Sequence, residues 1–165
     1  MRDNFKKWAK EILIFSVFIF FASIIINLIK QPNVPSNLLT ILETKMIGQD
    51  EIYKIPQNKP FVVVFWGSWC PICKQDLPNF SKVANGYDVI GVGVKSGSDS
   101  DILAFLKEND ISLKTINDEN GDIAQKFNIS TYPTTLIYDS SGNLKFTEVG
   151  YITTAGLKAR LKLIE

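Results

Sequence analysis

The chain has 165 residues, 45% of them hydrophobic, which suffices for one packed domain with a short appendage but not for two ordinary domains. Its formal net charge of +1 is unevenly distributed: residues 1–30 hold five basic and two acidic residues (+3), leaving 13 basic against 15 acidic residues (−2). No basic patch stands out in that remainder, so nucleic-acid binding has little support. The absence of histidine excludes histidine-based catalysis and nearly all common transition-metal sites.

An apolar segment near the N-terminus predicts a single membrane-spanning helix. Residues 12–29 carry no charge, and about 18 residues at 1.5 Å per residue match the hydrocarbon core of a bilayer. A buried helix of a soluble domain would keep a polar face, which this segment lacks. Basic residues cluster in residues 1–11, so the positive-inside rule places this end in the cytoplasm and the rest of the chain outside it. A cleaved signal peptide is the alternative, although no small-x-small cleavage pattern follows the segment.

The part of the chain beyond the apolar segment is expected to be a tether followed by one domain. Residues 30–37 contain two prolines among polar neighbours, which favours an extended linker. The domain then occupies residues 38–165, and its first segments, residues 38–43 and 50–55, alternate loosely enough to form a hairpin. On the outer side of the membrane, paired cysteines can cycle through a disulfide.

The rest of the domain alternates between strand and helix patterns. The run FVVVFW in residues 61–66 is β-branched and aromatic throughout, which predicts a central strand buried on both faces. The early alternation predicts parallel strands with right-handed crossovers, and a late hairpin adds an antiparallel edge. The expected order is β-α-β-α-β-α-β-β-α in residues 61–66, 71–85, 87–94, 98–110, 111–118, 122–129, 134–139, 144–150 and 153–164. This order predicts an α/β fold with a mixed central sheet flanked by helices.

Both cysteines of the chain, Cys70 and Cys73, lie where the central strand gives way to a helix. A sulfur at a helix N-terminus lies among unpaired N–H groups, which lower the pKa of the thiol and favour the reactive thiolate. Cys73 is one turn further on the same helical face, close enough to Cys70 to close a small disulfide ring. The spacing therefore permits Cys70 to attack a substrate disulfide and Cys73 to resolve the mixed disulfide.

Other roles for the two cysteines stay open at this point. They could be small buried residues or an inert disulfide. Zinc needs four ligands and haem attachment needs a histidine where Lys74 stands, so neither is expected. Copper(I), which two thiolates can hold linearly, is the strongest rival to redox chemistry. In the redox interpretation the site needs no cofactor and no metal.

The motifs FWGSWCPIC and STYPTT, together with the closing hairpin, resemble the thioredoxin superfamily. The similarity covers about residues 38–165 and is closest to the membrane-anchored, bacterial TlpA-like branch. Within that branch, the basic N-terminus, single apolar segment, proline-containing tether and WCPIC motif are most similar to the suppressor-of-copper-sensitivity D group. The resemblance implies a thioredoxin-like fold and thiol:disulfide exchange.

Three further site residues follow from the resemblance. Pro133 corresponds to the superfamily's cis-proline opposite the sulfurs, whereas the sequence alone favours an ordinary proline at the start of a strand, so this role rests on the resemblance. The backbone of Tyr132 would then face the cysteines and pair with an extended substrate segment. Trp69 would cover the disulfide with an aromatic surface, and a core or partner-contact role is the alternative.

Asp76 is the remaining candidate. It lies three residues after Cys73, so a helix places both on one side, and a partly buried carboxylate could accept or deliver the proton that exchange moves. Related anchored reductases carry an acid at this position, whereas the buried acid of thioredoxin itself is replaced here by Val64. A solvated acid in the first turn of the helix is the alternative.

The sequence thus predicts a protein thiol:disulfide oxidoreductase in the inner membrane of a bacterium, with its redox domain in the periplasm. Its expected partners are exported proteins with dithiols or disulfides and a membrane electron donor or acceptor. The direction of electron flow depends on how strongly the helix stabilises the Cys70 thiolate.

Overall fold

The structure, a computed structural model, describes residues 8, 11, 14–18 and 39–165. The chain divides into two units, Met1–Gln31 and Pro32–Glu165. In the first unit, the described residues are helical and exposed. None of the helices formed by the described residues has the length and apolar character needed to cross a membrane. Most of the predicted membrane-spanning segment, residues 12–29, and the predicted tether, residues 30–37, lie outside the described residues.

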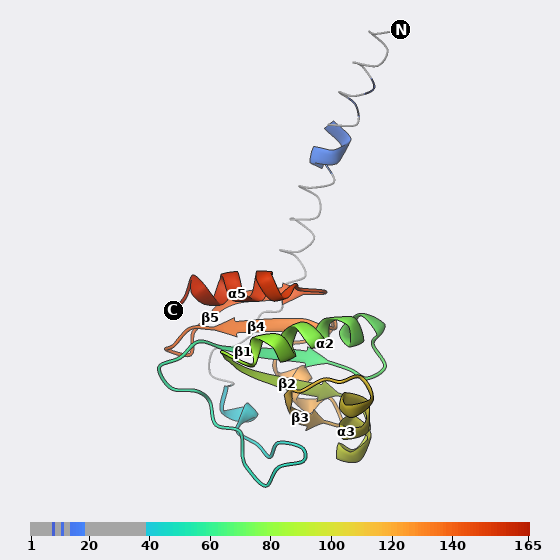
Figure 1. Cartoon of the computed structure of the whole chain (residues 1–165), viewed down its shortest axis with the longest axis vertical. Coiled ribbons are helices and arrows are strands. Elements are labelled where there is room, and N and C mark those ends of the chain that lie inside the picture. Colours follow the sequence, from blue (N-terminus) through green and yellow to red (C-terminus); the bar gives the residue numbers. More distant parts are fainter. Residues whose placement is uncertain (1–7, 9–10, 12–13, 19–38) are drawn as a thin grey trace. The chain divides into compact units, whose positions relative to one another are not determined.

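A five-stranded mixed sheet forms the centre of the second unit (Figure 1). Its order is β3-β2-β1-β4-β5, with β1 parallel to β2, β2 parallel to β3, and β4 antiparallel to both β1 and β5. The strands are β1 (Phe61–Trp66), β2 (Asp88–Val94), β3 (Lys114–Asp118), β4 (Thr134–Tyr138) and β5 (Leu144–Val149). The predicted order of elements and the antiparallel edge are confirmed.

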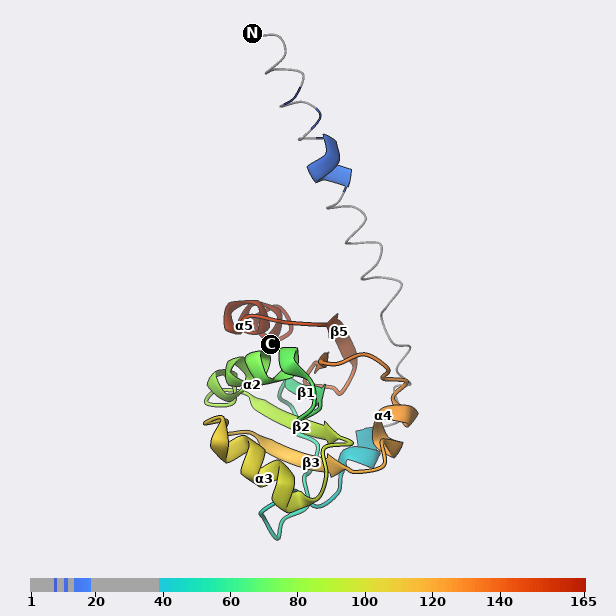
Figure 2. The same cartoon turned by 90° about the vertical axis from the view of Figure 1, so that its right-hand side faces the viewer.

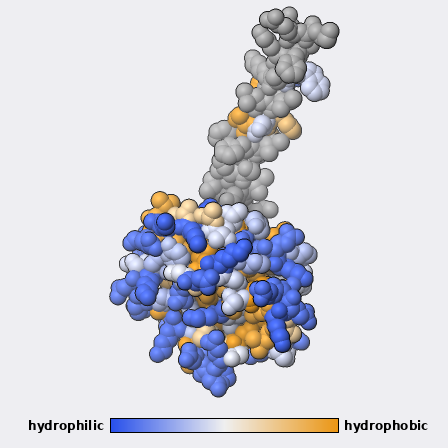
Figure 3. Space-filling model, in the orientation of Figure 1, coloured by the Kyte–Doolittle hydropathy of each residue, from blue (hydrophilic) through white to orange (hydrophobic). Residues whose placement is uncertain are grey.

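Helices cover both faces of this sheet (Figure 2). They are α2 (Pro71–Val83), α3 (Asp99–Glu108), α4 (Asp122–Lys126) and α5 (Thr154–Lys162), preceded by a 3-10 turn, η1 (Leu39–Leu42). Residues of α2, α3 and α5 pack on the Val62 and Val64 side of β1, and residues of η1 and α4 on the opposite side. All six residues of β1 are buried, as its apolar sequence predicts. On the face of this unit drawn in Figure 3, hydrophilic side chains predominate and hydrophobic ones show between them.

The predicted hairpin in residues 38–55 is wrong. The segment contains η1 and one isolated antiparallel bridge between Lys45 and Ile52. Its apolar side chains are instead buried singly in the two core clusters, and the Ile47 N–H donates to the carbonyl of Thr115 at 2.9 Å. Within residues 39–55 the segment pairs with itself around that bridge alone, where the Met46 N–H donates to the Glu51 carbonyl at 3.1 Å and the Tyr53 N–H to the Thr44 carbonyl at 2.9 Å, so the pairing is too short to form two strands.

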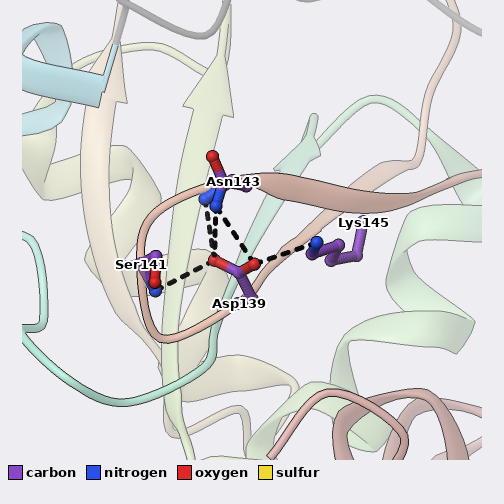
Figure 4. Close-up of polar contacts among 4 residues, drawn as sticks. All are labelled: Asp139, Ser141, Asn143 and Lys145. Carbon is purple, nitrogen blue, oxygen red and sulfur yellow. Dashed lines mark hydrogen bonds and ion pairs between the residues drawn. The ribbon is translucent and has the colours of Figure 1, made fainter.

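The turn between β4 and β5 is organised by the carboxylate of Asp139 (Figure 4). This carboxylate accepts the N–H groups of Ser141 and Asn143, both at 2.9 Å, and pairs with the Lys145 ammonium at 3.1 Å. These bonds, that of the Asn143 backbone foremost, lower the pKa of Asp139 to about 2. The turn holds β4 and β5 in the register that positions the loops at their far ends.

Candidate functional site

Cys70 and Cys73 form a disulfide at the start of α2, with their Cα atoms 5.2 Å apart. Cys70 is the N-cap residue, in extended backbone conformation, and Pro71 occupies the first turn, where a missing N–H costs nothing. The Cys70 sulfur accepts the Cys73 N–H at 3.2 Å. The predicted pair is therefore brought together, and the Cys73 N–H in the first turn of the helix points at the Cys70 sulfur.

The two cysteines differ in accessibility. Cys70 retains 6% of its surface, whereas Cys73 is fully buried in the cluster beneath α2. An incoming sulfur can therefore reach Cys70 but not Cys73. The division of roles that the sequence predicts, with Cys70 as the attacking and Cys73 as the resolving thiol, agrees with this difference.

The loop before β4 lies against the disulfide, because β4 begins beside the end of β1, where Thr134 is paired with Phe65. The Tyr132–Pro133 peptide bond is cis, as the resemblance implies. The carbonyl oxygen of Tyr132 lies 3.8 Å from the Cys70 sulfur, although 62 positions separate the two residues. The Pro133 carbonyl in turn accepts the Gly150 N–H at 2.8 Å, which joins this loop to the end of β5. The backbone of Tyr132 thus faces the cysteines.

Trp69 stands beside the disulfide with 55% of its surface exposed, so a core role is excluded. Its indole N–H donates to the Val94 carbonyl at 3.1 Å. Its ring meets that of Tyr132 edge to face, with centroids 5.3 Å apart. An exposed aromatic ring held on two sides offers a rigid apolar surface to a partner.

Ser96 supports this arrangement and was not predicted. Its buried hydroxyl accepts the Ser68 N–H at 2.9 Å and donates to the Val94 carbonyl at 3.1 Å, the same oxygen that receives the indole N–H of Trp69. The serine lies in a polar connection between β2 and α3, where sequence patterns indicate only a turn.

Gly67 makes room for the indole of Trp69, and its replacement by alanine is expected to displace that ring. An added Cβ would lie 2.5 Å from the ring, too close for any real contact. We expect Gly67→Ala to slow exchange with protein disulfides several-fold, and exchange with a small disulfide much less, because only large substrates use the ring. Stopped-flow kinetics with both substrate types measures this difference. Gly86→Ala, where a Cβ meets nothing within 4 Å, is the matched control. Equal slowing with both substrates would contradict a role in substrate contact.

Asp76 is buried one helical turn beyond Cys73, so the alternative of a solvated acid is wrong. Its Oδ1 accepts the Ile152 N–H at 3.2 Å and the Asn79 amide at 3.3 Å, and its Oδ2 has no hydrogen-bond partner among the described residues. Burial raises the pKa of Asp76 to about 6, although the two hydrogen bonds act in the opposite direction. A carboxyl group that titrates near neutral pH can both accept and return a proton. Neither Asn79 nor Ile152 was predicted: the i, i+3 spacing on the helix relates Asn79 to Asp76 but was not used, and nothing in the sequence relates Ile152 to Asp76.

The described part of the chain contains no group of three or more histidine, cysteine, aspartate or glutamate side chains placed to hold a metal ion. The site therefore presents two sulfurs, a neighbouring buried carboxyl group and an exposed aromatic ring. Such a set can open and re-form a disulfide, with Asp76, one helical turn from Cys73, as a group that can take up or release a proton.

Comparisons with known proteins agree with this chemistry. Residues 40–147 match the AhpC/TSA family. A thioredoxin-like protein of Haemophilus influenzae is 32% identical over 154 residues, covering 92% of this chain and 91% of that protein. Sporulation thiol-disulfide oxidoreductase A of Bacillus subtilis is 28% identical over 136 residues, covering 78% of this chain and 80% of that protein. Among solved structures, the pneumococcal exposed lipoprotein thioredoxin Etrx1 of Streptococcus pneumoniae has a TM-score of 0.58 at 27% identity, covering 65% of this chain and 86% of that one.

Fold, cysteine pair and relatives point to one assignment. The sheet with helices on both faces carries a disulfide at the start of α2 opposite a cis-proline. The chain therefore belongs to the AhpC/TSA family and is a thioredoxin-like thiol-disulfide oxidoreductase.

Proposed function

We propose that the protein is a membrane-anchored thiol:disulfide oxidoreductase that exchanges disulfides with exported proteins on the outer side of the bacterial inner membrane. The observation that carries the catalytic part is the Cys70 sulfur, which caps α2 and lies 3.8 Å from the carbonyl of Tyr132. The suppressor-of-copper-sensitivity D group is the proposed branch, on the basis of the N-terminal pattern and the WCPIC motif.

The proposed reaction is a two-electron exchange in two steps. With the protein oxidised, a substrate thiolate attacks the Cys70 sulfur, a mixed disulfide forms, and Cys73 leaves as a thiolate. The second substrate thiolate then attacks the substrate sulfur of the mixed disulfide, which releases oxidised substrate and Cys70 as a thiolate. The same steps in reverse reduce a substrate disulfide.

Asp76 is proposed to handle the proton of Cys73. Burying a charged thiolate is costly, and so is burying a charged carboxylate. A single proton shared between Cys73 and Asp76 therefore prevents both groups from being charged at the same time. In the reductive direction Asp76 takes the proton from the Cys73 thiol as that sulfur attacks. In the oxidative direction it returns the proton to the departing thiolate.

Substrate is proposed to bind as an extended segment along residues 131–133. The backbone of Tyr132 faces the cysteines, and its N–H makes no hydrogen bond to another described residue, so it is free to pair with a substrate carbonyl. Three exposed apolar side chains offer further contacts. The ring of Trp69 contacts that of Tyr132, Tyr151 follows Gly150, whose N–H bonds to the Pro133 carbonyl, and Ile72 lies between the two cysteines. A substrate cysteine flanked by apolar residues fits this surface.

The proposed compartment is supported by the charge and hydropathy of residues 1–29 and by the likeness to an exposed lipoprotein thioredoxin. The test uses the full chain in intact bacterial cells. We expect it to stay with the membrane after alkaline carbonate extraction, and its reduced cysteines to react with a thiol reagent that cannot cross the inner membrane. Release by carbonate would contradict anchoring, and labelling only after lysis would contradict the outward orientation. A Lys45→Cys variant, at an exposed position, is the control for reagent access.

The direction of electron flow follows from the reduction potential of the full chain. A value near about −120 mV indicates a dithiol oxidase, and one near about −270 mV indicates a reductase supplied through the membrane. The rival function, copper(I) binding by the same two sulfurs, predicts high copper(I) affinity of the reduced protein and no mixed disulfides with other proteins.

A further inference from the structure

Asn79 joins Asp76 to the start of α5 through a chain of hydrogen bonds that the proposed reaction does not use. Its amide nitrogen donates to the Ile152 carbonyl at 3.0 Å and to Asp76 Oδ1 at 3.3 Å. Its amide oxygen accepts the hydroxyl of Thr154, the first residue of α5, at 2.9 Å. The contacts connect α2 to a segment more than 70 positions away.

The orientation of the Asn79 amide is determined by its partners. The Ile152 carbonyl can only accept a hydrogen bond, so the end of the side chain that faces it must be the NH2 group. The opposite end is then the carbonyl oxygen, and the Thr154 hydroxyl must donate to it. Both hydrogens of the NH2 group are thereby assigned, one to Ile152 and one to Asp76.

This assignment distinguishes the two oxygens of Asp76. Oδ1 receives two N–H groups, from Ile152 and Asn79, and neither of them can accept a proton in return. A proton on Oδ1 would compete with these donors. Oδ2 is buried and makes no hydrogen bond to a described residue, so it is the oxygen at which a proton is gained and lost.

We propose that Asn79 is a positioning residue, which holds Oδ1 of Asp76 so that Oδ2 alone exchanges the proton, and that Thr154 keeps Asn79 in this orientation. The proposal rests on the proposed role of Asp76 in proton transfer. It assigns to the start of α5 a part in the chemistry at the start of α2. Neither residue touches the sulfurs in this arrangement, and both act through Asp76.

Few charged groups lie where they could shift the pKa of Asp76 in addition to the hydrogen bond from Asn79. On α2, Lys74 and Lys82 are exposed; on α5, Lys158 and Lys162 are exposed, and Arg160 is paired with Glu148 at 2.7 Å. Tyr151, on the connection before α5, is exposed as well, and β1 carries no titratable side chain. The shifted pKa of Asp76 has burial and the two hydrogen bonds as its causes, and no charge among them. The thiols of Cys70 and Cys73, once reduced, are the remaining titratable neighbours.

The test is a titration of the Asp76 carboxyl carbon by NMR in the oxidised full chain, with Asp76→Asn to identify the signal. Asn79→Leu keeps the branching at Cγ but removes the donated hydrogen bond. We expect it to raise the titration midpoint of Asp76 by about one pH unit, because that bond favours the carboxylate. The pH profile of the exchange rate should move in the same direction. Asn109→Leu is the matched control, because among the described residues its side-chain amide bonds only to the Phe105 carbonyl.

Thr154 provides a second, milder test. We expect Thr154→Val, which removes the hydroxyl and keeps the shape, to raise the midpoint by less, and Thr154→Ser to leave it unchanged. An unchanged Asp76 midpoint in folded Asn79→Leu overturns the proposal. If that variant does not fold, an unchanged midpoint in Thr154→Val overturns it. Failure of the underlying function would look different: Asp76→Asn itself would leave exchange rates unaltered at every pH.

Discussion

Replacing Cys73 with serine is expected to convert the enzyme into a trap for its substrates. The variant keeps the Cys70 thiol, which can still attack a substrate disulfide, but lacks the sulfur that resolves the product. Mixed disulfides with exported proteins should accumulate, and turnover should fall on the order of 10³-fold or more. Gels run without reductant reveal the adducts as bands that disappear when a reductant is added. Mass spectrometry of those bands identifies the substrates.

The reciprocal variant, Cys70→Ser, is the matched control for the trap. It should be equally inactive but should form no adducts, because its remaining sulfur, Cys73, has no exposed surface. Adducts through Cys73 in this variant, and none through Cys70 in the other, would reverse the assigned roles. The absence of adducts in both, together with tight copper(I) binding by the reduced wild-type protein, would favour the rival function.

Replacing Asp76 with asparagine is expected to stabilise the protein above pH 6. Burial raises the pKa of Asp76 from 3.8 to about 6. Below about pH 4 the Asp76 carboxyl group is protonated in both the folded and the unfolded state, so it does not lower the free energy of unfolding. Between about pH 4 and pH 6 the folded state binds the extra proton, so the unfolding free energy of the wild type falls as the pH rises, by about 3 kcal/mol in all. The variant has no such loss and should be more stable by about that amount at pH 7.5.

Denaturant unfolding of the oxidised full chain at pH 4 and pH 7.5 measures this difference. Asp139→Asn is a control of opposite sign: the pKa of Asp139 is lowered, so its carboxylate stabilises the protein above about pH 4 and this contribution is lost as the pH falls toward 2. Asp139→Asn should therefore destabilise the protein at pH 7.5. If the free energy of unfolding of the wild type does not change between pH 4 and pH 6, the pKa of Asp76 is not raised by burial.

The same Asp76→Asn variant should slow exchange about 10- to 100-fold at pH 7, because the proton of Cys73 loses its acceptor. The dependence of the wild-type rate on a group with a pKa of about 6 should disappear. Higher stability with lower activity separates a functional carboxyl group from a structural one. A variant that is more stable and fully active would show that the buried carboxyl group has no part in the reaction.

The order of helices and strands and the position of the redox pair were predictable from the sequence. Strands and helices have different hydrophobic periods, so the apolar run of β1 is recognisable as a strand and the amphipathic pattern of α3 as a helix from neighbouring residues alone. Cys70 lies next to a strand–helix junction, and a helix start acts on a sulfur through the N–H groups of its own first turn. These features depend on neighbours within about four residues, and that range of information is present in the sequence.

Other features needed the tertiary structure. The segment before β1 was expected to be a hairpin, but its apolar residues find partners on the sheet, which local patterns do not show. That Pro133 lies opposite the sulfurs came from resemblance, and the contact of the preceding Tyr132 carbonyl with the Cys70 sulfur is established only by the fold. Asn79 and Ser96 carried no signal at all, since an asparagine on a helix and a serine in a turn are ordinary.

Residue types and their spacing establish the chemistry that is available: two thiols one helical turn apart, an acid one turn further, and a central strand that must be buried. The tertiary structure decided which of these groups is reachable and which is charged. Burial leaves Cys70 accessible and Cys73 enclosed, and it raises the pKa of Asp76, because the cost of desolvating a charge depends on every element packed around it. One partner of Asp76, Asn79, lies on the same helix, whereas the other, the Ile152 N–H, is 76 positions away and can bond to Asp76 only once the chain has folded.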